Sequence, residues 1–214
     1  MLFRSVTKIV AGVDEAGRGP IAGPVVSAAA ILSPIQVKTL LSAGLNDSKK
    51  LSVRAREDLF LLIRELRVVW RAQAASNRRI DRTNILRSTL WAMECAVLSL
   101  PVSPDLVVVD GNVLLPRLPR ASQIAVPKAD GKVPAVMAAS VIAKVLRDKI
   151  MMRLHLLYPE YGFDRHKGYP TKLHRGVLDM IGPSPVHRLS FAGCVRNARN
   201  ESFACGGDVP WPTE

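Results

Sequence analysis

The sequence has few of the features that mark disulfide-rich, zinc-binding or membrane-spanning proteins. Its three cysteines, Cys95, Cys194 and Cys205, show neither close pairing nor metal-type spacing. The most apolar stretch, Ile21 to Leu32, has 12 residues, well short of the roughly 20 that span a bilayer. Near the N-terminus the apolar residues are interrupted at Asp14, which does not fit the apolar region of a secretory signal. We therefore expect a cytoplasmic protein without a disulfide framework.

Aromatic and acidic residues are also scarce. Only 5% of the residues are aromatic, so small and branched aliphatic side chains must fill the interior. The 18 acidic residues face 30 Lys and Arg, which gives a formal net charge of +12 at pH 7. Such an excess points to a polyanionic partner, either nucleic acid or an anionic membrane surface. The cations are spread through loops rather than along a basic amphipathic helix, which disfavours the membrane.

The length and the remaining composition indicate one folded domain. The 214 residues, 48% of them hydrophobic and 22% charged, have the composition of a globular protein. A chain of this size can bury roughly 70% of its unfolded surface. No internal repeat or Gly-, Ser- or Pro-rich linker divides the chain. We expect one domain over residues 1–200 and a flexible tail over residues 201–214.

Hydrophobic periodicity predicts strands that alternate with helices. Val- and Ile-rich runs at residues 9–13 and 23–32, with glycine and proline between them, favour two strands joined as a hairpin. This pattern is typical of an α/β fold, and the fully apolar run at 106–109 suits a strand covered on both faces. Further strands are expected at residues 68–70, 106–109 and 124–126, and helices after Ser52, at 81–100 and at 134–157.

Four acidic residues lie where predicted strands end. Asp14 and Glu15 end the first strand, Asp110 ends the fourth, and Asp130 follows the fifth. Ligand sites of open α/β sheets favour strand ends, so these carboxylates can converge. Because neighbouring residues on a strand face opposite sides, Asp14 and Glu15 share a site only if the chain bends directly after them. The segment from residue 16 to Pro20 supplies that bend.

Carboxylates crowded together repel one another unless cations neutralise them. Hard oxygen ligands suit Mg²⁺ or Mn²⁺, and two such ions could drive an in-line displacement at a phosphate. An acidic metal site on a basic protein suggests phosphodiester chemistry. For any single strand-end acid, a solvated turn residue is the commoner alternative.

Glycine and basic residues supply candidate ligand-binding loops. In Gly17-Arg18-Gly19 the glycines let backbone N–H groups approach an anion or a sugar edge, and Arg18 can bind a phosphate. A tight turn with an exposed arginine is the alternative. Lys49 and Lys50 precede a helix, where they could hold a nucleic-acid backbone or simply face solvent.

The C-terminal third is basic and contains all four histidines. Between Lys144 and Arg199 there are 11 Lys and Arg against 4 Asp and Glu. Tyr169, in a basic loop, could stack on a base or a sugar, although a half-buried tyrosine is more frequent. The histidines have no ligand-like spacing, so we expect surface or nucleic-acid-facing roles and assign none to catalysis. They are His155, His166, His174 and His187.

These motifs together resemble the ribonuclease HII family. The segments from Gly12 to Pro20 and from Gly23 to Val26 are similar to the opening motif of that family, which cuts the RNA strand of RNA–DNA hybrids. The other motifs follow in family order, from about Val10 to Arg196. They are Leu45 to Leu51, Val109 to Asn112, Lys128 to Asp130, Ala138 to Asp148 and Tyr161 to Thr171.

The resemblance implies a ribonuclease H-like fold, in which helices flank a mixed five-stranded sheet and the C-terminal part is helical. It implies two Mn²⁺ or Mg²⁺ ions and cleavage that leaves a 5′-phosphate and a 3′-hydroxyl, including on the 5′ side of a single ribonucleotide in duplex DNA. The implied partners are RNA–DNA hybrids and DNA that contains ribonucleotides, with no membrane, and we expect a monomer.

The resemblance also assigns residues. The catalytic, metal-binding acids would be Asp14, Glu15, Asp110 and Asp130. Gly17, Arg18 and Gly19 would sense the ribonucleotide 2′-hydroxyl, and Tyr169 would stack on the sugar of the following nucleotide. Lys49, Lys50, Ser140 and Lys144 would contact the substrate.

The sequence departs from the family pattern at a few positions, and two alternative interpretations remain. Leu189 stands where the family commonly has arginine, and Gly193-Cys194 replaces a more usual proline. Ribonuclease HIII shares the fold, but members of that family have a longer chain and Gly-Thr-Gly in place of Gly-Arg-Gly. Arg18 and the short segment before Asp14 therefore disfavour this alternative. A non-catalytic nucleic-acid-binding protein would explain the charge, but it would not need four acids at strand ends.

Overall fold

A five-stranded mixed sheet organises the protein. The computed structural model describes residues 8–194, and its strand order is β3-β2-β1-β4-β5. β1 pairs antiparallel with β2 and parallel with β4, β2 pairs antiparallel with β3, and β4 pairs parallel with β5. The predicted hairpin and mixed sheet are confirmed. The strands are β1 (Val10–Ala16), β2 (Val25–Ile31), β3 (Val69–Ala75), β4 (Leu106–Asp110) and β5 (Gln123–Val126).

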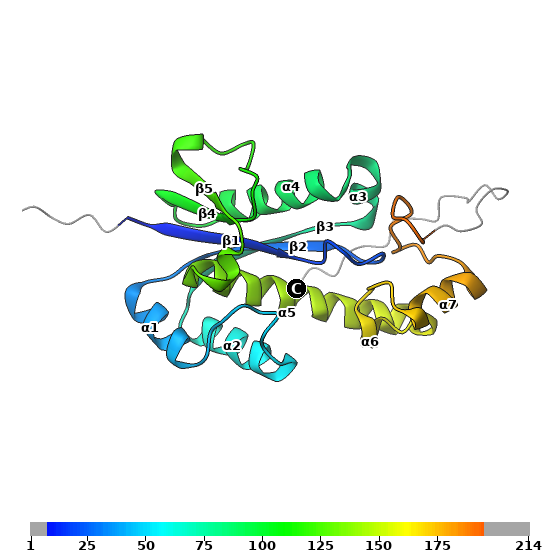
Figure 1. The fold of residues 1–214 in the computed structure, drawn as a ribbon. Helices are drawn as coiled ribbons and strands as arrows, with labels where there is room; N and C mark the ends of the chain where they lie inside the picture. The colour runs from blue at the N-terminus through cyan, green and yellow to red at the C-terminus, as the bar shows by residue number, and fades with distance from the viewer. Residues whose placement is uncertain (1–7, 195–214) are drawn as a thin grey trace, which may run out of the picture.

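Helices cover both faces of this sheet. Figure 1 shows the sheet nearly edge-on, with α4 on one face, α1, α2 and α5 on the other, and α6 and α7 beyond one end. No helix within residues 8–194 is both long enough and apolar enough to cross a membrane. The helices are α1 (Pro34–Ser42), α2 (Val53–Glu65), α3 (Asn77–Thr83), α4 (Ile85–Leu98), α5 (Pro134–Leu157), α6 (Phe163–His166) and α7 (Lys172–Ile181), with short 3-10 turns η1 (Arg120–Ser122), η2 (Ala129–Gly131) and η3 (Pro159–Tyr161).

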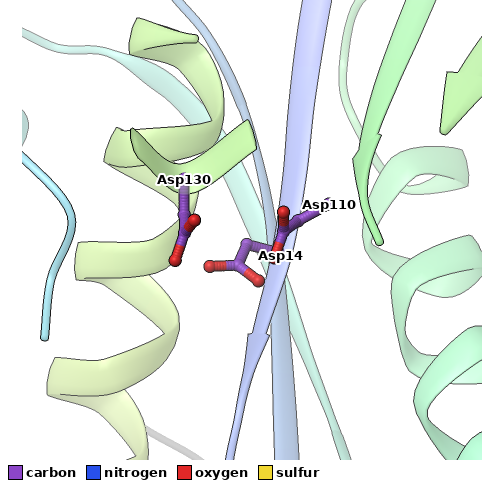
Figure 2. Close-up of side chains that lie close together, drawn as sticks. All are labelled: Asp14, Asp110 and Asp130. Carbon is purple, nitrogen blue, oxygen red and sulfur yellow. The ribbon is translucent and has the colours of Figure 1, made fainter. Parts of the chain in front are cut away.

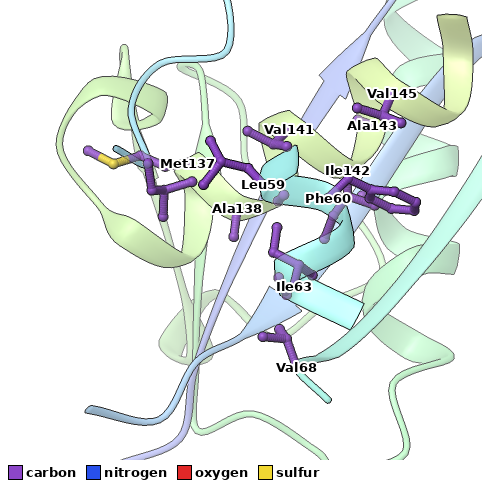
Figure 3. Close-up of a cluster of buried hydrophobic side chains, with 14 of the residues drawn as sticks. Leu59, Phe60, Ile63, Val68, Met137, Ala138, Val141, Ile142, Ala143 and Val145 are labelled. Carbon is purple, nitrogen blue, oxygen red and sulfur yellow. The ribbon is translucent and has the colours of Figure 1, made fainter. Parts of the chain in front are cut away.

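Small side chains let α5 lie close to the middle of the sheet. On β2, Ala28 and Ala30 join the core beneath α2 and α5, whereas Ala29 joins the core beneath α4. This alternation is the period of two that a strand imposes. Leu59 and Ile63 of α2 complete the first core (Figure 3). The low aromatic content therefore corresponds to an interior built from alanine, valine and leucine.

The same alternation on β1 aims one acid at α5. Val13 packs under α4, so its neighbours Gly12 and Asp14 face α5. A Cβ atom on Gly12 would lie 2.2 Å from the backbone nitrogen of Val136. Strand and helix are therefore in direct backbone contact at this point, immediately beside Asp14.

One helix prediction needs correction, and one helix was not predicted. The helix expected at 81–100 is two helices, α3 and α4, because Asn84 adopts φ 154° and its side chain caps α4 by accepting from the backbone N–H of Arg87. The helix α1 was not predicted from the sequence. Ser33 and Gln36 form its capping box, a signal that was present in the sequence.

Three of the four histidines are buried, so the expected surface role is wrong for them. His166, His174 and His187 are at most 8% exposed and pack around Phe163. His174 Nε2 lies 2.9 Å from His187 Nε2. The cluster joins α6 and α7 to the segment that follows them, which a sequence pattern does not reveal. His155 is only partly buried and lies beside Asp164.

Because of this histidine cluster, we expect the folded state to lose stability in acid. Burial, the largest cause, lowers the pKa of His174 to about 4 and that of His187 to about 3. The folded state thus favours the neutral rings, and their contribution to stability is complete above pH 6.5 and lost as the pH falls toward 4. The free energy of unfolding should decrease by up to about 1.4 kcal/mol per pH unit for each histidine.

Urea unfolding between pH 7 and pH 4 measures this slope. His174→Asn should make the slope shallower. Parallel curves for wild type and His174→Asn would contradict the prediction.

Candidate active site

Three carboxylates converge at the edge of the sheet where β1 and β4 end. Asp14 lies on β1, Asp110 is the last residue of β4, and Asp130 lies in η2 just before α5. One carboxylate oxygen of each lies within 4.8 Å of the others. Figure 2 shows the three side chains turned toward a common centre.

Parallel strand pairing brings the first two acids together. Val13 of β1 pairs with Val109 of β4, so the next residue of each strand, Asp14 and Asp110, lies at the same level of the sheet. Asp110 Oδ1 accepts a hydrogen bond of 2.7 Å from the backbone N–H of Ala129, which ties β4 to η2. Residues separated by more than a hundred positions in the chain thereby form one cluster.

Burial and mutual repulsion disfavour the charged forms of the clustered acids. Burial is the main cause that raises the pKa of Asp14 well above its ordinary value, and the charges of Glu15 and Asp110 raise it further. A hydrogen bond from Ser140 opposes this shift. Burial also raises the pKa of Asp110, assisted by the charge of Asp130. Like charges held this close indicate a site built for positive charge.

Glu15 lies beside the cluster rather than within it. β1 continues through Glu15 to Ala16, and Glu15 pairs with Ser27, so the chain bends one residue later than predicted. Burial raises the pKa of Glu15, whereas Arg18 opposes the shift from 3.4 Å away. Glu15 nevertheless lines the same cavity as Asp14 and Asp110.

The donor set fits divalent metal ions. Carboxylate oxygens are the ligands that Mg²⁺ and Mn²⁺ prefer. The side chain of Asp130 is 4% exposed. Lys49 Nζ donates to its Oδ2 at 2.9 Å and so places one positive charge directly beside the carboxylate cluster. Asp14, Asp110 and Asp130 could hold such an ion, with Glu15 at the margin.

A cavity of about 220 Å³ joins the carboxylates to the glycine loop, residues 17–19. The loop begins with Gly17 at φ 98°, a left-handed conformation that favours glycine. Tyr169 lines the same cavity and is 44% exposed, and its Cε1 would be 3.6 Å from a Cβ atom on Gly19. The loop and the tyrosine therefore border the same space.

The other predicted substrate contacts divide into two groups. Ser140 and Lys144, both on α5, line the cavity together with Lys49. Ser140 is buried and hydrogen-bonds Ser48 at 2.8 Å, and Lys144 donates to Asp148 at 2.7 Å. Lys50 is exposed and is not among the residues lining this cavity.

Two buried arginines at the site were missed as functional candidates. Arg147 lines the cavity, and Arg188 hydrogen-bonds the carbonyl oxygens of Gly17 and Arg18. Arg147 was inside a motif already singled out for its family likeness, which was the available signal. Arg188 directly precedes Leu189, the position that departs from the family pattern and is 51% exposed.

The family model for ribonuclease HII matches residues 11–194 of this chain. The chain belongs to the ribonuclease HII family. It is 50% identical over 188 residues to the ribonuclease HII of Dechloromonas aromatica (strain RCB), covering 88% of this chain and 93% of that relative. The protein is therefore a ribonuclease H, an endoribonuclease that acts on RNA–DNA hybrids, and its family uses divalent metals.

Solved structures confirm the ribonuclease H-like fold. The ribonuclease H2 of Pyrococcus horikoshii OT3 is 30% identical and superposes with a TM-score of 0.75, covering 87% of this chain and 95% of that one. Bst-RNase HIII in complex with Mn²⁺ is 20% identical, with a TM-score of 0.69 over 87% of this chain and 68% of that one. The second likeness shows the shared fold alone. Because the family model and the 50% identical relative both belong to ribonuclease HII, the ribonuclease HIII alternative is rejected.

Proposed function

We propose that this ribonuclease HII cuts duplex DNA on the 5′ side of a single embedded ribonucleotide, in addition to longer RNA–DNA hybrids. One observation carries the proposal: a single cavity is lined by the acids Asp14 and Asp110, the glycine loop and Tyr169. A cleaving centre and a group able to recognise one sugar are thus within reach of the same nucleotide.

The reaction we propose is hydrolysis that leaves a 5′-phosphate and a 3′-hydroxyl. Asp14, Asp110 and Asp130 would hold two Mg²⁺ or Mn²⁺ ions, with Glu15 contributing from the cavity wall. When bound, such ions activate water and stabilise the charge that develops at the phosphate and the leaving oxygen. The rigid placement of the acids on β1, β4 and η2 would hold the scissile phosphate in line with the attacking water.

Selectivity for ribonucleotides would come from the glycine loop and Tyr169, which line the same cavity as the acids. The 2′-hydroxyl is the group by which a protein distinguishes RNA from DNA, because it both donates and accepts hydrogen bonds. Gly17 and Gly19 have no side chains to block an approach to this hydroxyl, and Arg18 could bind the adjacent phosphate. The exposed ring of Tyr169 would stack on the sugar of the following nucleotide.

Basic residues around the cavity would hold the rest of the duplex. Lys49, Lys50 and Lys144 would contact backbone phosphates together with Ser140. Such contacts carry no sequence information, so binding should weaken as salt rises.

We further propose that residues 1–200 form one catalytic domain and that the enzyme acts as a monomer in the cytoplasm. Removal of misincorporated ribonucleotides and of replication primers would both use the proposed specificity. The flexible tail expected at residues 201–214 lies outside the described residues.

Cleavage of an end-labelled DNA duplex containing one ribonucleotide tests the proposal. We expect a single cut on the 5′ side of that ribonucleotide with Mg²⁺ or Mn²⁺ and none with EDTA. Cutting of longer RNA–DNA hybrids only would contradict the single-ribonucleotide specificity. Product ends are checked by ligation, which requires a 5′-phosphate and a 3′-hydroxyl.

Tyr169→Ala should reduce cleavage at the single ribonucleotide about 10- to 100-fold, because stacking of an aromatic ring contributes about 1–3 kcal/mol. Tyr169→Phe keeps the ring and should retain most of the rate. The comparison is made from kcat/KM on the same duplex. Equal rates for Tyr169→Ala and Tyr169→Phe would exclude the stacking role.

A further inference from the structure

Arg188 is a buried cation whose side chain donates hydrogen bonds to main-chain carbonyl groups. Its side chain is fully buried, with 0% of the residue exposed. Nη2 donates to the carbonyl oxygen of Gly17 at 2.7 Å, Nη1 to that of Arg18 at 3.0 Å, and Nε to that of Gly23 at 2.9 Å. One planar guanidinium thus fixes two successive peptide groups of the glycine loop relative to the strand that follows it.

Arg147 of α5 supports the same loop from a second direction. It is 1% exposed, and it donates to the carbonyl oxygens of Pro24 at 3.1 Å and Lys167 at 2.9 Å. Its Nε lies 1.9 Å from the position that a Cβ atom on Gly17 would take. Its guanidinium carbon is 6.0 Å from the centroid of the Tyr169 ring. Arg147 therefore contacts both recognition elements of the cavity.

Burial of this pair is energetically costly. Within residues 8–194, neither guanidinium has a carboxylate within 4.0 Å. Burial lowers the pKa of Arg147 to about 10 and, with the nearby charge of Arg147, lowers the pKa of Arg188 to about 9. Buried charges without an ion pair are rare, because desolvation costs several kcal/mol. A purely apolar core would avoid this cost.

The carbonyl contacts decide where the loop amides point. In a planar trans peptide, the carbonyl oxygen of one residue and the N–H of the next point in opposite directions. Because the carbonyls of Gly17 and Arg18 face Arg188, the N–H groups of Arg18 and Gly19 face away from it. Among the described residues these two N–H groups have no hydrogen-bond acceptor, and both residues line the cavity.

We propose that Arg147 and Arg188 are positioning residues that hold the glycine loop so that two free backbone N–H groups face the 2′-hydroxyl side of the bound nucleotide. This inference rests on the proposed single-ribonucleotide specificity. A planar fork of N–H donors holds two carbonyls in a fixed relative geometry, whereas the rotatable donors of a lysine ammonium do not impose that geometry. Arg188→Lys therefore keeps the charge and removes the alignment.

Binding to two matched duplexes tests the proposal. The duplexes differ in one 2′-hydroxyl, and their affinities are measured by fluorescence anisotropy in EDTA, so that no cleavage occurs. Wild type should prefer the duplex with the ribonucleotide. Arg188→Lys and Arg147→Lys should each reduce this preference about tenfold, the effect of losing one charge-assisted hydrogen-bond network. Their affinity for the all-DNA duplex should stay within twofold of wild type.

The outcomes separate the possible failures. Parallel loss of affinity for both duplexes would indicate a merely structural role and overturn the proposal, as would an unchanged preference in folded variants. The exposed Arg64 on α2 supplies the control, and Arg64→Lys should change neither affinity. No preference in wild type would overturn the single-ribonucleotide specificity itself, and the positioning role with it.

A measurement on the wild type does not depend on variants that fold. Amide hydrogen exchange at Arg18 and Gly19 should be fast in the free enzyme and slowed by the duplex with the ribonucleotide. The all-DNA duplex should slow it much less. Equal protection by both duplexes would contradict the assigned direction of these N–H groups.

Discussion

Asp110→Asn is expected to lower the cleavage rate by at least about 10³-fold while leaving hybrid binding largely intact. The asparagine oxygen can still accept the hydrogen bond that Ala129 donates to Asp110, so the link between β4 and η2 survives. The change removes one negative charge from the cluster formed with Asp14 and Asp130. Several kcal/mol of charge stabilisation at the transition state depend on that cluster.

The measurement compares cleavage with Mg²⁺ or Mn²⁺ and binding in EDTA on the same labelled duplex. Asp58→Asn is the matched control, because Asp58 is an exposed residue of α2, and this variant should cleave at the wild-type rate. Near-wild-type cleavage by Asp110→Asn would exclude Asp110 from the catalytic centre. Loss of binding as well as cleavage would show that Asp110 stabilises the fold rather than taking part in the reaction.

Gly12→Ala should have the largest effect on stability. The added Cβ atom would lie 2.2 Å from the backbone nitrogen of Val136 and 2.3 Å from the carbonyl carbon of Ala135. Both are backbone atoms of α5, so no side-chain rotation relieves the overlap. Overpacking costs about 1–3 kcal/mol where side chains can adjust, and more where backbone must move. We expect a loss above about 3 kcal/mol and a fall in Tm of about 10 °C.

Gly176→Ala is the control for this change. A Cβ atom on Gly176, in α7, meets no atom within 4 Å, so the substitution should raise stability by up to about 1 kcal/mol through helix propensity. Thermal unfolding followed by circular dichroism measures both variants. An unchanged Tm in Gly12→Ala would mean that β1 and α5 can separate without cost.

The elements predicted well from the sequence have local signals. The apolar runs around Gly23 and Pro24 predicted the β1–β2 hairpin, and the pattern that begins at Pro134 predicted α5 with the bounds that the structure has. The break at Asn84 was not predicted, because apolar periodicity continues across it and the change lies in the backbone conformation of this one residue.

The site was predictable to different degrees. Spacing placed Asp14, Asp110 and Asp130 at strand ends, and the parallel pairing of β1 with β4 brings the first two together. The resemblance supplied their roles, which remain predictions for this chain. Whether Glu15 can share the site with Asp14 depends on how far β1 continues, and the local sequence does not show where the strand ends.

Burial of polar side chains could not be predicted from sequence. His174, His187 and Arg188 are basic residues that a pattern assigns to the surface. They are buried because segments distant in the chain surround them and supply acceptors, such as the carbonyl of Gly23 for Arg188. No local window contains both partners of such a contact.

Contacts between segments far apart in the chain also set the order in which the site can form during synthesis on the ribosome. The N–H of Gly23 bonds the carbonyl of Val186, and the N–H of Arg188 bonds the carbonyl of Ile21. Asp110, at the end of β4, is translated long after Asp14, and Arg188, which holds the glycine loop, is translated later still. During synthesis the glycine loop can therefore gain its contacts with Arg188 only after all the acids of the cluster have been translated.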